Sequence, residues 1–210
     1  MAYDFVSTNT QYLSTTNPVS AAPLTIACWA WVNNTTGTKA LVSLNQNASA
    51  NNRFVLFMNG SGLTYSVAGG GAATNAAATG TQAANTWFHA CAVEVAVNNR
   101  FCYRNGANAV QNTFTRIPTS INALNIGNNI VSNANTQLLS GRVAEVGIWN
   151  AALTAEEVAS LAQGMTCDKV RPQSLVFYAP LVRNLNDQKG GLTITNNNGA
   201  TVATHPRVYA

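Results

Sequence analysis

The chain has 210 residues, of which 47% are hydrophobic and only 9% are charged. This length suits one β-sandwich or barrel with a sizeable core, so we expect a single domain over residues 1–210. The formal net charge of +4 reflects a scarcity of acids, and Arg100 and Arg104 are expected to be scattered surface residues. No nucleic-acid partner is expected, because that function needs clustered cations or an interleaved aromatic stripe.

The N-terminal segment MAYDFVSTNTQYL has neither the cationic start nor the apolar run of a secretory signal. No apolar run is long enough to span a membrane, so we expect synthesis in a cytoplasm and no membrane partner. No C-x-x-C pair or zinc spacing occurs among the cysteines, which are Cys28, Cys91, Cys102 and Cys167. Because Cys28 and Cys91 lie in apolar strand patterns, we expect buried reduced thiols and no cofactor.

Short alternating segments predict strands through the first half of the chain. They cover residues 3–13, 24–32, 39–45, 53–58 and a segment after the turn at 59–62. The segment 24–32, LTIACWAWV, is apolar on both faces, which is typical of a central strand covered on both sides. Residues 68–85 are rich in Ala and Gly and are expected to form a long surface loop.

The second half continues the same pattern. Strands are predicted at 86–97, at 100–110 around an Asn105-Gly106 turn, within 114–126 and at 175–182. Residues 128–137 are expected to be a polar loop. Residues 192–194 and 200–203 are expected to pair as a closing hairpin, followed by a tail that contains His205. Many short strands with a turn about every ten residues predict a sandwich or jelly roll.

The segment 141–164 predicts a strand, a tight turn and one short helix. A period of two places Val143 and Glu145 on one face of the strand and Ala144 and Val146 on the other. Thr154-Ala155-Glu156-Glu157 fits a capping box. The helix is therefore predicted near 154–163, with Gly164 suited to its C-terminal end.

Several segments in order resemble the laminin-G-like, concanavalin A-like jelly rolls. These segments are TIACWAWV, TWFHACAVEVAVNNRFCYRNGANAV, ALNIGNN, GRVAEVGIWNAALTAEEVASL and LVFYAPLVRNLNDQKGG. The resemblance covers nearly the whole chain and implies an all-β, two-sheet antiparallel jelly-roll sandwich, with Glu145 and His89 in structural roles. Family members include lectins, calcium-dependent binding domains, glycosidases and structural virion domains, so the fold alone does not choose a function.

Catalysis is not expected from the acids. The chain has seven, which are Asp4, Glu94, Glu145, Glu156, Glu157, Asp168 and Asp187. None of them form an i, i+2 pair on a strand, whereas glycosidases need two carboxyl groups flanking the scissile bond. Glu156 and Glu157 are assigned to the helix N-terminus, where acids are stabilising. No G-x-S-x-G elbow is present either, so we expect a non-enzymatic protein.

Two kinds of binding site are considered. Asp187 is the best single candidate for a calcium ligand and Asp4 the second, but an Asx turn at Asp187 is favoured because few acids are available. Trp29 and Trp31 share a strand face and would suit glycan or partner contact, and Asn side chains, which could supply amide hydrogen bonds, are plentiful in the chain. A core position for both tryptophans is the favoured alternative.

The low charge, the missing active site and a resemblance to domains of bacteriophage structural proteins lead to a functional hypothesis. We expect a virion protein, above all a capsid decoration or cement protein at the capsid surface. Its partners would be the major capsid protein and copies of itself as a homo-oligomer. The alternative is a glycan-binding module of a tail fibre or receptor-binding protein, with contacts through Trp29 and Trp31.

Overall fold

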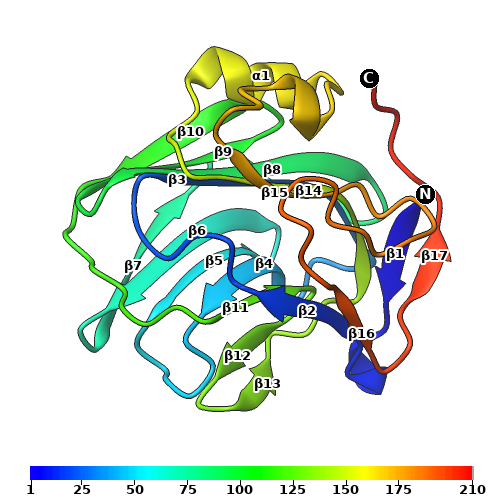
Figure 1. The fold of residues 1–210 in the computed structure, drawn as a ribbon, viewed down its shortest axis with the longest axis horizontal. Helices are drawn as coiled ribbons and strands as arrows, with labels where there is room; N and C mark the ends of the chain where they lie inside the picture. The colour runs from blue at the N-terminus through cyan, green and yellow to red at the C-terminus, as the bar shows by residue number, and fades with distance from the viewer. Residues whose placement is uncertain (210) are drawn as a thin grey trace.

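Two large antiparallel sheets pack face to face in the computed structural model, which describes residues 1–209 apart from the side chain of Asn108 (Figure 1). The eight-stranded sheet runs in the order β10 (Ala107–Asn112), β9 (Asn99–Arg104), β8 (Trp87–Ala96), β3 (Leu24–Val32), β14 (Gly141–Trp149), β1 (Ala2–Phe5) and β17 (Thr201–Ala203), with β15 (Leu175–Ala179) also paired to β14. The predicted all-β jelly-roll sandwich is confirmed.

The second large sheet has seven strands and lies below the first in Figure 1. Its order is β16 (Thr195–Asn197), β2 (Tyr12–Thr16), β11 (Ala123–Ile126), β4 (Thr38–Asn45), β5 (Arg53–Asn59), β6 (Gly62–Gly69) and β7 (Ala72–Ala77). The remaining elements are the hairpin β12 (Asn129–Val131) and β13 (Ala134–Thr136), the helix α1 (Ala155–Ala162), and the 3-10 turns η1 (Ser7–Asn9) and η2 (Cys167–Lys169).

The main core lies between the two sheets, and β3 shows how the sequence builds it. Leu24, Ile26 and Cys28 point into this core together with Ala30 and Val32, as the alternating pattern predicts. All four cysteines are buried and free, in agreement with the prediction for Cys28 and Cys91.

The helix α1 lies over the outer face of the eight-stranded sheet (Figure 1). A second, smaller core is packed between the helix and this face. Val158 and Leu161 of the helix pack there against Trp149. The predicted capping box is present: the Thr154 hydroxyl accepts from the Glu157 amide at 3.3 Å, and the Glu157 carboxylate accepts from the Thr154 amide at 2.7 Å. Within residues 1–209, no helix has the length and apolar character needed to cross a membrane.

A β-bulge interrupts β14 at Glu145, which has φ of 52°. The register advances by three positions along β14, from Ala144 to Gly147, but by only two along β3, from Trp29 to Ala27. Val143 and Val146 therefore both face the main core, and their predicted placement on opposite faces was wrong because the bulge inserts one residue. The strand that pairs with β14 also changes at the bulge, since β1 pairs with residues 141–143 and β15 with residues 146–149.

The terminal strands correct two further predictions. Residues 3–13 are not one strand, because η1 and the left-handed Thr10 (φ 51°) reverse the chain between β1 and β2, which join different sheets. The expected closing hairpin is also wrong: β17 pairs with β1 in one sheet, whereas β16 pairs with β2 in the other.

Two expected loops contain strands. Within 68–85, β7 forms the edge of the seven-stranded sheet through pairing with β6, so small Ala side chains suffice at a position with one neighbouring strand. Residues 128–137 hold the hairpin β12–β13. Backbone pairing decides both cases, because neither segment carries the alternating pattern from which strands were predicted. Within 114–126, only β11 is a strand.

Candidate functional site

Three tryptophans lie together on the outer face of the eight-stranded sheet. Trp29 and Trp31 alternate with core residues along β3, and Trp87 of β8 lies directly opposite Trp31. The Trp31 and Trp87 rings meet edge to face with their centroids 5.9 Å apart. All three side chains are partly exposed, so the core position favoured for Trp29 and Trp31 is wrong. We call Trp29, Trp31 and Trp87 the tryptophan platform.

Arg142 adds a positive charge to this platform. Its register position on β14 is opposite Trp31, and its guanidinium carbon lies 5.1 Å from the centre of the Trp31 ring. The guanidinium also forms an ion pair with Asp4 at 3.6 Å and donates to the Thr204 hydroxyl at 2.8 Å. A cation over an indole face is stabilising, so Arg142 is held in place at the platform edge. Asp4 is thereby accounted for as an ion-pair partner.

His89 is a buried side chain that packs beside the tryptophan platform. Its ring meets Trp29 edge to face at 5.5 Å, and the side chain is almost completely buried. Burial lowers the pKa of His89 to about 3, which keeps the imidazole neutral near pH 7. Its backbone amide donates to Asn105 at 2.9 Å. His89 therefore supports Trp29, in agreement with its predicted structural role.

Sequence reasoning identified part of the platform and missed the rest. Trp29 and Trp31 were singled out because they share one strand face. Trp87 and Arg142 come from other strands, and only the pairing of β3 with β8 and β14 brings them beside Trp31. The sequence did carry one signal for Trp87. The Trp-x-His pattern at the start of β8 matches the Trp-x-Trp pattern of β3 when the two strands are paired antiparallel.

A buried amide cluster lies on the outer face of the other sheet. The Asn45 amide nitrogen donates to the Asn129 side chain at 2.7 Å and to the Ile130 carbonyl at 3.0 Å. The Asn125 amide donates to Asn45 at 3.4 Å, and these three asparagines are almost fully buried. The cluster anchors the hairpin β12–β13 over β4 and β11, so the side-chain amides of Asn45 and Asn129 are used internally.

Asp187 forms the Asx turn that was the favoured alternative to a calcium ligand. One carboxylate oxygen accepts from the amides of Tyr178, Lys189 and Gly190 at 2.9–3.1 Å, and the other accepts from Leu192 at 3.0 Å. Both oxygens therefore organise the loop after β15. Among the residues described, no group of three His, Cys, Asp or Glu side chains is placed to hold a metal ion.

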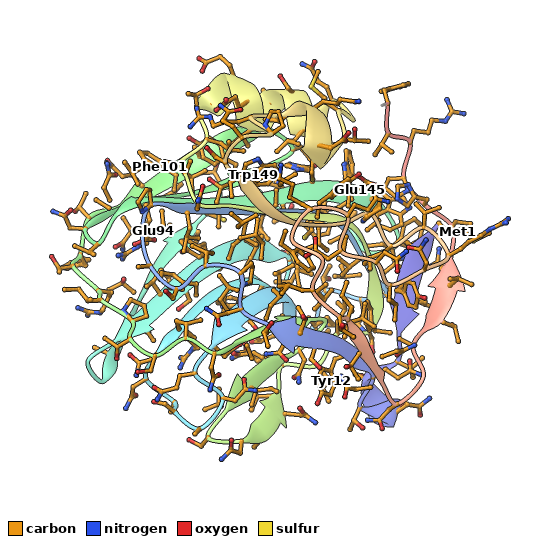
Figure 2. The ribbon with its side chains drawn as sticks, in the orientation of Figure 1. Met1, Tyr12, Glu94, Phe101, Glu145 and Trp149 are labelled. Atoms are coloured by element: carbon orange, nitrogen blue, oxygen red, sulfur yellow. The ribbon has the colours of Figure 1, made fainter. Side chains whose placement is uncertain are left out.

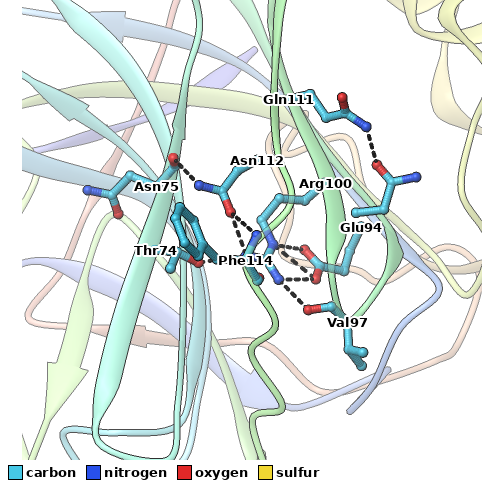
Figure 3. A network of polar contacts seen from close by, with 9 residues as sticks. Thr74, Asn75, Glu94, Val97, Arg100, Gln111, Asn112 and Phe114 are labelled. Atoms are coloured by element: carbon cyan, nitrogen blue, oxygen red, sulfur yellow. Dashed lines mark hydrogen bonds and ion pairs between the residues drawn. The ribbon is translucent and has the colours of Figure 1, made fainter.

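Glu94 and Arg100 form a fully buried ion pair at one end of the sandwich (Figure 3). The Arg100 Nε lies 2.9 Å from a Glu94 oxygen, and its other nitrogens donate to the side chains of Thr74 and Asn112 and to two backbone carbonyls. Burial raises the pKa of Glu94, and the Arg100 hydrogen bonds act in the opposite direction. The network ties β7 to β8, β9 and β10 and assigns Glu94 a structural role.

The expected surface position of Arg100 and Arg104 is therefore wrong. Both side chains are buried. Arg100 tolerates burial because the β8–β9 register places it directly opposite Glu94, which supplies the charge partner that a buried guanidinium requires. Glu94 and Arg100 are six residues apart in the sequence, and this spacing alone did not show that they pair across the β8–β9 hairpin.

The two sheets, the capped helix and the exposed tryptophans define a lectin-like jelly roll. A family model, Laminin_G_3 of the concanavalin A-like lectin/glucanases superfamily, matches residues 7–159. The chain belongs to this family. Comparison with curated proteins gives no significant match.

Solved structures share the fold at low sequence identity. A heptameric SAP-like pentraxin from Limulus polyphemus has a TM-score of 0.69 and 17% identity, over 95% of this chain and 93% of the pentraxin. A putative carbohydrate binding protein from Bacteroides ovatus has a TM-score of 0.65 and 15% identity, over 96% of this chain and 61% of that protein. The CBM40 of a Ruminococcus gnavus sialidase has a TM-score of 0.63 and 11% identity, over 77% of this chain and 97% of the module.

Proposed function

We propose that this chain is a non-catalytic glycan-binding module that holds sugars on the tryptophan platform. The observation that carries this proposal is the set of three partly exposed indoles on one sheet face, with Arg142 at its edge. An indole offers a large apolar face with little conformational entropy to lose, which suits the C–H faces of a sugar ring. The Arg142 guanidinium would donate hydrogen bonds to sugar oxygens.

The structural neighbours support the same class of ligand. One is named as a putative carbohydrate binding protein, and the Ruminococcus gnavus CBM40 has been solved bound to α2,3 sialyllactose. These similarities favour the glycan-binding alternative over the capsid decoration hypothesis.

The test is a glycan array followed by calorimetric titration of the best hit. Trp31→Ala should weaken binding by about 30-fold, which corresponds to about 2 kcal/mol for an aromatic anchor. Phe114→Ala is the matched control, because Phe114 is 67% exposed and lies outside the platform. Wild-type affinity in Trp31→Ala, or no glycan bound at all, would contradict the proposal.

The bacteriophage setting stays a separate prediction from the sequence. Mass spectrometry of purified particles tests a virion location, and copy number per particle separates a capsid lattice role from a tail appendage. Self-association also stays a prediction. Light scattering after size-exclusion chromatography tests it, and the heptameric state of the Limulus pentraxin motivates the measurement.

A further inference from the structure

A cleft lies where the C-terminal tail, residues 204–209, returns to the end of α1 (Figure 1). Its lining comes from three places in the chain: Ser160 and Gln163 from α1 and its C-cap, Met165 and Lys169 from the segment that leads into η2, and Tyr209 from the tail. The volume is about 290 Å³, close to the lower end of the range for small-molecule sites. The cleft therefore has room for about one ring.

Backbone hydrogen bonds fix the walls of this cleft. The Met165 amide donates to the Ser160 carbonyl at 3.1 Å, which sets the chain as it leaves the helix. The Tyr209 amide donates to the Gly164 carbonyl at 2.6 Å, and the Thr166 amide donates to the Tyr209 carbonyl at 3.2 Å. Because these bonds join the tail to the segment after α1, the cleft is formed before any ligand arrives.

The Tyr209 ring offers an aromatic surface to this cleft. Gly164 has φ of 103°, and a Cβ atom there would lie 3.1 Å from Cδ2 and 3.2 Å from Cε2 of the ring. The missing side chain therefore lets the ring lie close to the backbone. Tyr209 is nevertheless 66% exposed, and Met165 beside it is 42% exposed. A ring held in this way presents an apolar face with little conformational entropy to lose.

Polar groups line the same cleft. The Ser160 hydroxyl donates to the Glu156 carbonyl at 2.9 Å, so its oxygen keeps lone pairs that can accept. The Lys169 ammonium lies 3.4 Å from the Asp168 carboxylate and carries three N–H donors. Gln163 adds an amide, which both donates and accepts. An aromatic face bordered by donors and acceptors matches a pyranose ring, which has an apolar C–H face and a rim of hydroxyl groups.

We infer that this cleft is a second sugar-binding site, which takes one pyranose ring stacked on Tyr209. Gln163 and Lys169 donate to its hydroxyl groups, and the flexible Met165 side chain packs against its edge. None of the lining residues belongs to the tryptophan platform. The cleft is therefore tested separately from the proposed function.

The methionines make this cleft observable by NMR in the full chain, since the sequence has only three of them. The protein is labelled with ¹³C at the methionine methyl groups and titrated with galactose, N-acetylglucosamine and N-acetylneuraminic acid in turn. At least one sugar should shift the Met165 methyl resonance to saturation, with a Kd on the order of millimolar because one ring makes few contacts. Met58 is 1% exposed in the main core and should not respond.

Two substitutions of Tyr209 separate stacking from other effects. Tyr209→Ala removes the aromatic face and should weaken the Met165-detected affinity by about tenfold. Tyr209→Phe keeps the ring and should retain most of the affinity. Phe114→Ala is the matched control, because Phe114 is 67% exposed and lies outside the cleft.

The inference is overturned if none of the three sugars shifts Met165, or if Tyr209→Ala binds as tightly as the wild type. The indole N–H resonances of Trp29, Trp31 and Trp87, followed in the same titrations with ¹⁵N label, report on the platform. Indole shifts alone would overturn the cleft and leave the proposed function standing. A saturable Met165 shift without indole shifts would retain the cleft independently of the proposed function.

Discussion

The outer face of the eight-stranded sheet has two halves, of which one is buried and the other is partly exposed to solvent. Under α1, the outer face of the eight-stranded sheet carries Ala27 and Cys91 and is fully buried. Further along the same strands, the face carries Trp29, Trp31 and Trp87 and stays partly exposed. Small residues allow the helix to lie close to the sheet, whereas bulky indoles occupy the space that a covering element would need.

Gly147 and Trp149 show how closely the covered half is packed. A Cβ atom at Gly147 would lie 2.6 Å from both the Cys167 sulfur and the Trp149 ring. Trp149 is completely buried, and its indole nitrogen donates to the Val170 carbonyl at 2.8 Å. Figure 2 shows it between α1 and the sheet. The same residue type thus stabilises the fold at Trp149 and is available for binding at Trp31.

The largest expected difference between the buried and the exposed half is in the stability lost when Trp149 or Trp31 is replaced by alanine. Trp149→Ala should lower the free energy of unfolding by about 3–5 kcal/mol, because it leaves a cavity and an unpaired carbonyl. Trp31→Ala should cost about 1 kcal/mol, since its indole is already partly solvated. Urea titration of both variants measures the difference, and equal losses would show that the two halves are not distinct.

His89 lies where the two halves meet, and its burial predicts a smaller, pH-dependent effect. Its pKa of about 3 lies below the ordinary histidine value, so the unfolded chain gains a proton before the folded one does. Stability should therefore fall as the pH drops below 6.5. His89→Gln should reduce the loss between pH 6.5 and 4.5 by about 2 kcal/mol, as measured by thermal unfolding. If stability falls with decreasing pH by the same amount in the wild type and in His89→Gln, His89 is not buried in its neutral form.

The helix that covers one half depends on its N-terminal cap, which predicts the smallest effect. Thr154→Ala removes a hydrogen bond to the Glu157 amide and should cost about 1 kcal/mol. The affinity for any glycan found under the proposed function should not change, because Thr154 contacts Glu157 and is not part of the tryptophan platform. Thr154→Ser, which keeps the hydroxyl, is the control. A selective loss of binding with an unchanged Tm would contradict this assignment.

Much of the fold was predictable because local patterns carry it. The alternation in 24–32 predicted β3 with its correct faces, and the Thr154–Glu157 box predicted α1. Predictions failed where pairing partners decide the structure: the bulge at Glu145 lies between the part of β14 that pairs with β1 and the part that pairs with β15. Strand β7 likewise owes its existence to pairing with β6.

By itself, the sequence determined a sandwich or jelly roll, the capped helix and the candidacy of Trp29 and Trp31, because these follow from periodicity and local hydrogen bonding. The resemblance to laminin-G-like domains selected the jelly roll. Only the tertiary structure decided that both indoles face outward, that Trp87 and Arg142 join them, and that His205 meets Glu145. These contacts join residues that are distant in the chain. Which face of a strand is covered depends on where α1 ends, and strand periodicity carries no information about that position.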